Sequence, residues 1–211
     1  MKNLILFDID DTLINTVLFR KIQDETLANF LKINDLEIKK NRSDYYHQLK
    51  KGSDFSVDEY LSLLAKKYNH DLKKIKEIFL NKKNIELCLY KEVPRVLTNL
   101  KKQGFSLGIF SEGYESFQLH KIASNNLLRF FDEEYLYIMR RKIDSQLLEN
   151  LPSGTIIIDD KPSILSELKQ FKNIVPIQIT RENLTENKIV CENHINNLEE
   201  LFGLLLKLND S

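Results

Sequence analysis

The stretch Leu4-Ile5-Leu6-Phe7-Asp8-Ile9-Asp10-Asp11-Thr12-Leu13 decides the fold of this chain. Its apolar residues 4–7 predict a buried strand, and three aspartates follow that strand directly. Open α/β sheets bind ligands at the carboxyl ends of parallel strands, so this acidic loop lies where a binding site belongs. An acidic turn that merely ends a strand is the alternative. Three aspartates after a buried strand are costly, however, unless a cation compensates their charge.

Four later runs of apolar, β-rich sequence predict further strands. They are Phe105–Phe110, Tyr135–Ile138, Thr155–Ile158 and Ile174–Ile179. Helical patterns between the later runs complete strand-helix-strand units, which require parallel strands joined by right-handed crossovers. The sequence therefore predicts an α/β fold built on a parallel sheet.

The first two predicted strands are much farther apart in sequence than one crossover helix requires. Ser56-Val57-Asp58-Glu59 is typical of a capping box, and Asp71 can cap a further helix. Apolar residues recur at helical spacing around both signals. We therefore expect an all-helical insertion over residues 15–90, with residues 1–14 and 91–211 forming the α/β core.

A second acidic pair, Asp159-Asp160, follows the apolar run Ile156-Ile157-Ile158. We expect it to converge with Asp8 and Asp10 on one edge of the sheet. Carboxylates gathered in one place repel each other unless a hard cation lies among them, and oxygen-only ligation indicates Mg²⁺ rather than zinc. Bound Mg²⁺ would offset the charge of a phosphate. Asp8 and Asp10 could then divide the work, one attacking as nucleophile while the other moves protons.

These signals, taken in their order along the chain, resemble the haloacid dehalogenase-like (HAD) superfamily. They are Asp8-x-Asp10-x-Thr12 after the first strand, Phe110-Ser111 ending the second, a basic residue near Lys142, and the Asp159-Asp160 pair. The resemblance covers nearly the whole chain. It implies a Rossmann-like parallel-sheet core and, because the helical insertion lies between the first two motifs, a C1-type cap that closes over the site.

The resemblance also implies a role for each matching residue. Asp8 matches the nucleophile that forms an aspartyl-phosphate, and Asp10 matches the general acid that protonates the leaving oxygen and then activates water. Thr12 matches the threonine that shapes the loop. Ser111 would hydrogen-bond the transferring phosphoryl group, and Lys142 would neutralise its charge. The implied Mg²⁺ ligands are Asp8, the backbone carbonyl of Asp10, and Asp160, with Asp159 as second choice or support.

Two positions depart from the family pattern. Where an asparagine or another small polar residue usually follows the serine, this chain has Glu112 and Gly113. We expect the Glu112 side chain to point away while Gly113 gives the backbone approach to phosphate, and a role for Glu112 in accepting a substrate hydroxyl stays open. The third motif offers three cations in a row. We choose Lys142 because Asp144 can then cap the next helix, and Arg141 is the alternative.

Composition bounds the classes of function. The 211 residues are 42% apolar and 29% charged, and 31 basic residues balance 31 acidic ones, so no basic excess favours nucleic acid as a partner. The spacing of Cys88 and Cys191 supports neither a disulfide framework nor a zinc site, and we expect reduced, packed thiols. No apolar run is long enough for a membrane span, so we expect a cytoplasmic protein. The oligomeric state stays open.

The leading hypothesis is a Mg²⁺-dependent phosphatase acting on a small phosphorylated metabolite. A phosphomutase needs the same aspartates, and a catalytically silent binding or regulatory protein would keep the scaffold without turnover. A dehalogenase would have no use for Asp10 or the late acidic pair, and a receiver domain would lack the insertion. Within the insertion, Arg20 and Tyr45-Tyr46-His47 are candidate specificity groups. Half-buried residues on a helix would give the same pattern, and we favour that interpretation.

Overall fold

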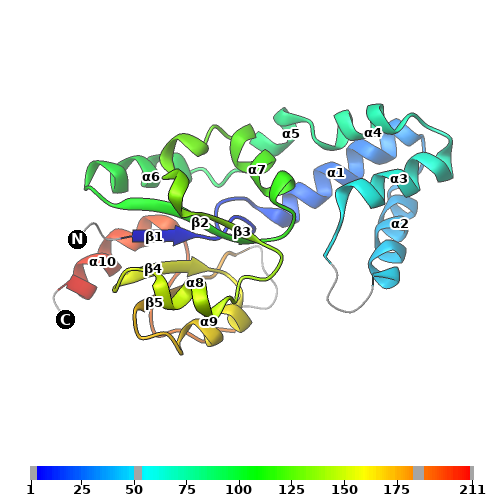
Figure 1. Cartoon of the computed structure of the whole chain (residues 1–211). Coiled ribbons are helices and arrows are strands. Elements are labelled where there is room, and N and C mark those ends of the chain that lie inside the picture. Colours follow the sequence, from blue (N-terminus) through cyan, green and yellow to red (C-terminus); the bar gives the residue numbers. More distant parts are fainter. Residues whose placement is uncertain (1–3, 50–53, 183–187, 210–211) are drawn as a thin grey trace.

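The computed structural model describes residues 4–49, 54–182 and 188–209 (Figure 1). Within them, six strands form one sheet in the order β3-β2-β1-β4-β5-β6, and every adjacent pair is parallel. The strands are β1 (Leu4–Phe7), β2 (Ser106–Glu112), β3 (Leu136–Met139), β4 (Thr155–Asp159), β5 (Ile174–Ile179) and β6 (His194–Ile195). The strand order reverses between β1 and β4, so the carboxyl ends of these two strands flank the point where such sheets bind ligands.

Helices cover both faces of this sheet. One face carries α6 (Val93–Lys102), α7 (Glu115–Ser124) and α10 (Leu201–Asn209), and the other carries α8 (Ser145–Asn150) and α9 (Pro162–Leu168). Successive strand residues point to opposite faces. Accordingly Ile5 and Phe7 pack with α6 and α10, while Leu4 and Leu6 pack with α8 and α9. The predicted α/β class with a Rossmann-like parallel sheet is confirmed.

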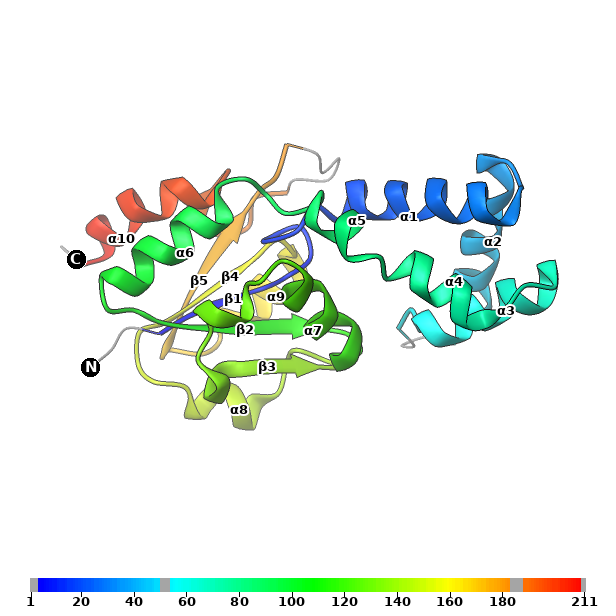
Figure 2. The same ribbon diagram turned by 90° about the horizontal axis from the view of Figure 1, so that it is seen from above.

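Five helices stand beyond the carboxyl ends of the strands (Figures 1 and 2). They are α1 (Thr16–Leu31), α2 (Asp35–Gln48), α3 (Val57–Tyr68), α4 (Leu72–Phe79) and α5 (Lys82–Glu86). Buried side chains of α1 to α4, among them Leu27, Ile38, Leu64 and Phe79, form a hydrophobic cluster of their own, whereas Ile85 of α5 belongs to the cluster that covers the sheet. We propose that these helices are the cap expected at residues 15–90.

Both predicted helix N-caps are present. The Ser56 hydroxyl accepts a hydrogen bond from the Glu59 N–H, and the Asp71 carboxylate accepts one from the Lys74 N–H. The capping box itself is incomplete, because the Ser56 N–H donates to the Tyr45 hydroxyl and not to Glu59. Gly104, which follows the end of α6, has a φ of 87°, in the left-handed region that favours glycine. Cys88 and Cys191 are buried free thiols, as expected.

Helix α2 and strand β6 are among the elements that the sequence patterns did not show. Helix α2 buries Ile38, Arg42 and Tyr45, which lie at helical spacing, but the central one is an arginine, so the apolar periodicity is broken. Strand β6 has two residues at the sheet edge, too few to produce an alternating pattern. In the described part of the chain, no helix combines the length and the apolar character that crossing a membrane requires.

Candidate active site

The loop after β1 is fixed at both ends. The Asp8 N–H donates to the Ile158 carbonyl of β4 at 2.9 Å, which places the start of the loop beside the end of β4. Asp11 adopts a left-handed conformation with φ of 54°, and its carboxylate accepts a 3.0 Å hydrogen bond from the Thr16 N–H at the start of α1. The loop therefore leads from the sheet straight into the first cap helix. Thr12 lies fully buried within it.

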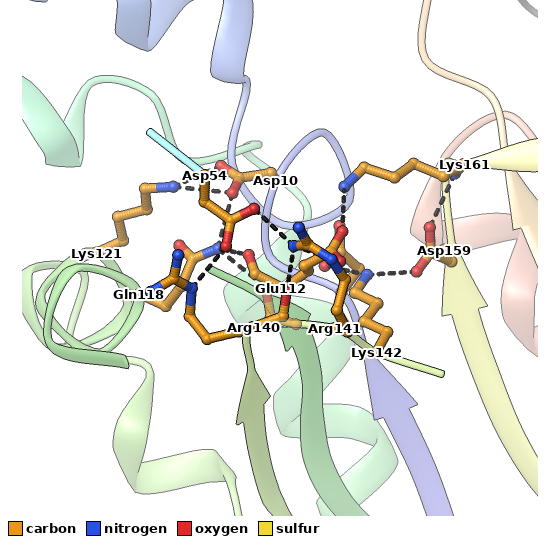
Figure 3. A network of polar contacts seen from close by, with 12 residues as sticks. Asp10, Asp54, Glu112, Gln118, Lys121, Arg140, Arg141, Lys142, Asp159 and Lys161 are labelled. Carbon is orange, nitrogen blue, oxygen red and sulfur yellow. Dashed lines mark hydrogen bonds and ion pairs between the residues drawn. The ribbon is translucent and has the colours of Figure 1, made fainter. Parts of the chain in front are cut away.

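A buried lysine joins the two acidic loops. Lys142 Nζ lies 2.6 Å from Asp8 Oδ1 and 2.5 Å from Asp159 Oδ2, and the residue is 1% exposed. Figure 3 shows Lys142 with its contact to Asp159. Burial by itself would lower the pKa of Lys142, but the Asp159 and Asp8 carboxylates outweigh it, so the pKa is raised and the ammonium stays charged. Burial raises the pKa of Asp8 to about 6, although the Lys142 ammonium opposes the rise. Of the two cations considered for the third motif, the structure thus brings Lys142 against Asp8.

Three carboxylates meet where a cation would be needed. Oxygen atoms of Asp8, Asp159 and Asp160 lie within 4.8 Å of one another. Asp8 Oδ2 and Asp160 Oδ1 are buried and have no hydrogen-bond partner among the described residues. Burial, together with repulsion by Asp8 and Asp159, raises the pKa of Asp160 to about 8. An all-oxygen set with two unpartnered, repelling oxygens fits a hard divalent cation such as Mg²⁺.

The two aspartates after β4 differ in their contacts. Both carboxylate oxygens of Asp159 have partners within the protein, because Oδ2 faces Lys142 and Oδ1 accepts the Lys161 N–H at 2.8 Å. Asp160 keeps an oxygen without a partner. This difference supports the predicted order, with Asp160 as the ligand and Asp159 as its support.

The Asp10 carboxylate points away from this cluster into a separate set of contacts. Lys121 Nζ lies 2.7 Å and 2.9 Å from its two oxygens, Gln118 Nε2 donates to it at 2.9 Å, and the Thr16 hydroxyl donates at 3.1 Å. Burial would raise the pKa of Asp10, but these contacts, led by Lys121, hold it well below its usual range. In this conformation Asp10 is held as a carboxylate.

Gln118 and Lys121 were missed by the sequence analysis. They lie one turn apart on α7, and both are buried. The sequence does place both residues on the same helix face as the apolar residues Phe117 and Ile122. Polar side chains on such a buried face need a hydrogen-bond partner. No local pattern, however, identifies Asp10 as that partner.

Gln118 also organises the loop after β2. Its Nε2 donates to the Ser111 hydroxyl at 3.1 Å and to the Glu112 carbonyl at 2.9 Å. Gly113 has a φ of 139°, and its N–H donates to the Met139 carbonyl at 2.8 Å, extending the pairing of β2 with β3. Because that N–H already has a partner, any contribution of Gly113 to phosphate binding would come from its small size at the cavity wall.

The expected orientation of Glu112 is wrong. Its side chain lines the cavity, 3.5 Å from Arg141 Nη1 and 3.7 Å from Lys161 Nζ. Arg141 and Lys161 make this orientation favourable, and the sequence alone does not show that these two cations lie beside Glu112. The same basic run reaches the cap, because Arg140 Nε and Arg141 Nη1 contact the two Asp54 oxygens at 2.6 Å and 2.7 Å (Figure 3).

A cavity of about 380 Å³ lies between the α/β core and the cap helices. Its wall includes Asp10, Gly113, Lys121 and Asp160 from the core side. Among the cap candidates, Arg20 and Tyr46 line it. Tyr45 instead donates its hydroxyl to Glu59 inside the cap, and His47 is exposed and outside the lining. This volume falls in the range of about 300–1,000 Å³ typical of small-molecule sites.

A parallel sheet in this order, with carboxylates after β1 and β4 and a buried lysine between them, defines a Rossmann-like α/β protein with a candidate hydrolytic site at its switch point. The sequence model of the haloacid dehalogenase-like hydrolases matches residues 5–149, more than half the chain, and the chain belongs to this family. The matched range ends before Asp159 and Asp160, which join the site through the tertiary structure. No curated protein sequence matches the chain significantly.

Solved structures share the fold at low sequence identity. YfnB from Bacillus subtilis, solved with bound magnesium, is 20% identical with a TM-score of 0.64, over 97% of this chain and 99% of that one. A HAD phosphatase from Thermococcus onnurineus is 20% identical with a TM-score of 0.59, over 97% and 98%. A 2-haloacid dehalogenase from Pseudomonas syringae pv. Tomato DC3000 is 18% identical with a TM-score of 0.70, over 99% and 100%. The solved structures that share this fold therefore include both a phosphatase and a dehalogenase.

Proposed function

We propose that this protein is a Mg²⁺-dependent phosphatase that hydrolyses a small phosphorylated metabolite through an aspartyl-phosphate on Asp8. The observation that carries the proposal is the buried cluster of Asp8, Asp159 and Asp160, with two oxygens that lack a partner. A displacement at carbon that uses no metal gains nothing from such a cluster, which favours phosphoryl transfer over the dehalogenase chemistry of some structural neighbours. Magnesium bound to one neighbour, YfnB, agrees with this assignment.

The proposed reaction begins with the Asp8 carboxylate. One of its two oxygens attacks phosphorus, an oxygen–phosphorus bond forms, and the ester bond to the leaving oxygen breaks. Lys142, beside Asp8 Oδ1, and the Ser111 hydroxyl would face the oxygens of the transferring group. Bound Mg²⁺ would supply further charge compensation, held by Asp8, Asp160 and the Asp10 backbone carbonyl.

Asp10 would move the protons. To protonate the leaving oxygen, Asp10 must first take up a proton, and in the second step it must remove one from water. Because Lys121 holds the pKa of Asp10 low, Asp10 has to loosen this contact for either step. That water attacks phosphorus, releasing phosphate and restoring the Asp8 carboxylate. A phosphomutase would use the same first step and exclude the water. A silent binding protein would take neither step.

Removal of the metal tests this proposal directly. We expect phosphate release from a panel of phosphorylated metabolites in Mg²⁺ and its loss in excess chelator, with recovery when Mg²⁺ is restored. Full activity in chelator would refute the metal-dependent assignment. Transfer of phosphate between two positions of a substrate, without release, would indicate the mutase, and the absence of any turnover would favour the silent protein.

Substitution of Asp10 separates proton transfer from nucleophilic attack. We expect Asp10→Asn to lower kcat by about 10²–10⁴-fold, because the amide cannot move the proton. Phosphate release under saturating substrate is the measurement. Glu115→Gln, an exposed site at the start of α7 outside the cavity lining, is the control and should leave kcat within about twofold of the original, as surface substitutions generally do. An Asp10→Asn variant with unchanged kcat would remove Asp10 from the mechanism.

A further inference from the structure

The far end of the cavity contains a buried polar group with no assigned task. Gln23 of α1 is 3% exposed and lines the cavity, and its carboxamide nitrogen has no hydrogen-bond partner among the described residues. A buried donor without a partner costs free energy unless a ligand satisfies it. It therefore points to an acceptor atom on a bound molecule.

Helix α1 sets the distance between this group and the reacting centre. Thr16, Phe19, Arg20 and Gln23 line the cavity from successive turns of the helix, and Thr16 contacts Asp10. At a rise of 1.5 Å per residue, Gln23 lies about 10 Å along the axis from Thr16. A substrate whose phosphoryl group meets Asp8 must therefore extend well beyond a few atoms to reach Gln23.

The cavity that Gln23 lines also has aromatic walls. Tyr46 and Phe55 also line the cavity, with ring centroids 5.4 Å apart, and Tyr46 is 42% exposed. The Arg42 guanidinium lies 5.5 Å from the Phe55 ring centroid, and its Nε and Nη2 contact Asp24 Oδ1 at 2.9 Å and 2.6 Å. Aromatic faces, together with the unpartnered Gln23 amide, are what a flat, hydrogen-bonding ring requires.

Charge argues against a second anionic group on the substrate. Five acidic and four basic side chains line the cavity. Three of the four bases already contact a carboxylate: Arg42 contacts Asp24, Lys121 contacts Asp10 and Lys161 contacts Glu112. A bisphosphate or a phosphorylated acid would meet no surplus of positive charge here.

We propose that the cap end of this cavity binds a neutral planar ring that carries a hydrogen-bond acceptor, so that the preferred substrates are nucleoside monophosphates rather than sugar phosphates. The inference rests on the proposed phosphatase function. In it, Gln23 donates to the ring's acceptor and Tyr46 packs against the ring face. These residues determine specificity, while Asp8 and its neighbours perform the reaction.

Matched substrates test the inference. Uridine 5′-monophosphate and ribose 5-phosphate present the same phosphorylated sugar with and without a ring. We expect kcat/KM for uridine 5′-monophosphate to exceed that for ribose 5-phosphate at least tenfold. Gln23→Leu should lower this ratio about 5–10-fold, and Tyr46→Ala about 5-fold or more. Gln146→Leu, on the exposed surface of α8, should leave the ratio unchanged.

Several outcomes would overturn it. One is equal kcat/KM for the two substrates. Another is faster turnover of fructose 1,6-bisphosphate than of uridine 5′-monophosphate. A third is an equal loss of kcat/KM for both substrates in Gln23→Leu.

If no phosphorylated compound is turned over, the proposed function fails and the inference is tested separately by calorimetry. Uridine 5′-monophosphate should then bind Asp8→Asn in Mg²⁺ at least fivefold more tightly than it binds the variant that also carries Gln23→Leu. Absence of binding, or equal binding, would refute the inference.

Discussion

Asp8→Asn abolishes phosphate release, with a fall in kcat of at least about 10³-fold, because a carboxamide cannot attack phosphorus and carry the transferred group. We expect this result because Asp8 Oδ2 is the buried oxygen without a partner and Oδ1 is held 2.6 Å from Lys142. The original protein, quenched in acid during turnover, should carry an acyl phosphate that hydroxylamine removes. The variant should carry none.

Stability separates this effect from misfolding. Asparagine has the shape of aspartate, Lys142 keeps its contact with Asp159, and one of three repelling carboxylates is removed. We therefore expect the Tm of Asp8→Asn in chelator to equal or exceed that of the original protein. Asp144→Asn is a matched control, because Asp144 caps α8 on the surface and asparagine caps equally well. If Asp8→Asn kept more than about a hundredth of the original kcat, the nucleophile would lie elsewhere.

Lys142→Met should destabilise the fold as well as stop turnover. Lys142 is buried between Asp8 and Asp159, and its removal leaves both carboxylates in a low-dielectric interior without a compensating charge. Breaking such a buried ion pair by removing one partner costs about 3–5 kcal/mol. We expect the free energy of unfolding, measured by urea denaturation in chelator, to fall by that amount.

Mg²⁺ gives this prediction a second measurement. A divalent cation among Asp8, Asp159 and Asp160 would restore part of the lost compensation, so Mg²⁺ should stabilise Lys142→Met more than it stabilises the original protein. Lys40→Met removes an exposed lysine paired with Asp44 and serves as the control, with an expected change within about 0.5 kcal/mol. Unchanged stability of Lys142→Met would mean that water reaches the ion pair.

Much of the fold follows from local pattern. The apolar runs that predict strands correspond to β1 through β5, and the polar caps Ser56 and Asp71 start helices where expected. These signals are local, because burial of a strand and capping of a helix depend on residues a few positions apart. Helix α2 was less visible because Arg42, at the centre of its buried face, is satisfied by Asp24 on another helix.

The site is less local. Asp8, Asp10 and the Asp159-Asp160 pair could be located from the strands that precede them, and the structure brings Asp8 together with the late pair. The choice of Lys142 over Arg141 depends on a contact across 134 positions, and the pairing of Asp10 with Lys121 spans 111. The placement of Glu112 was wrong for the same reason, since its two cations come from other loops.

The sequence by itself determined the parallel α/β core, the helical insertion and the acidic loops at the ends of β1 and β4. Only the tertiary structure decided which lysine meets Asp8, which side chains hold Asp10, and that Gln23 reaches the cavity with an unpartnered amide. The physical reason is that periodicity and capping record whether a residue is buried, whereas the partner of a buried charge or amide is set by which distant elements pack beside it.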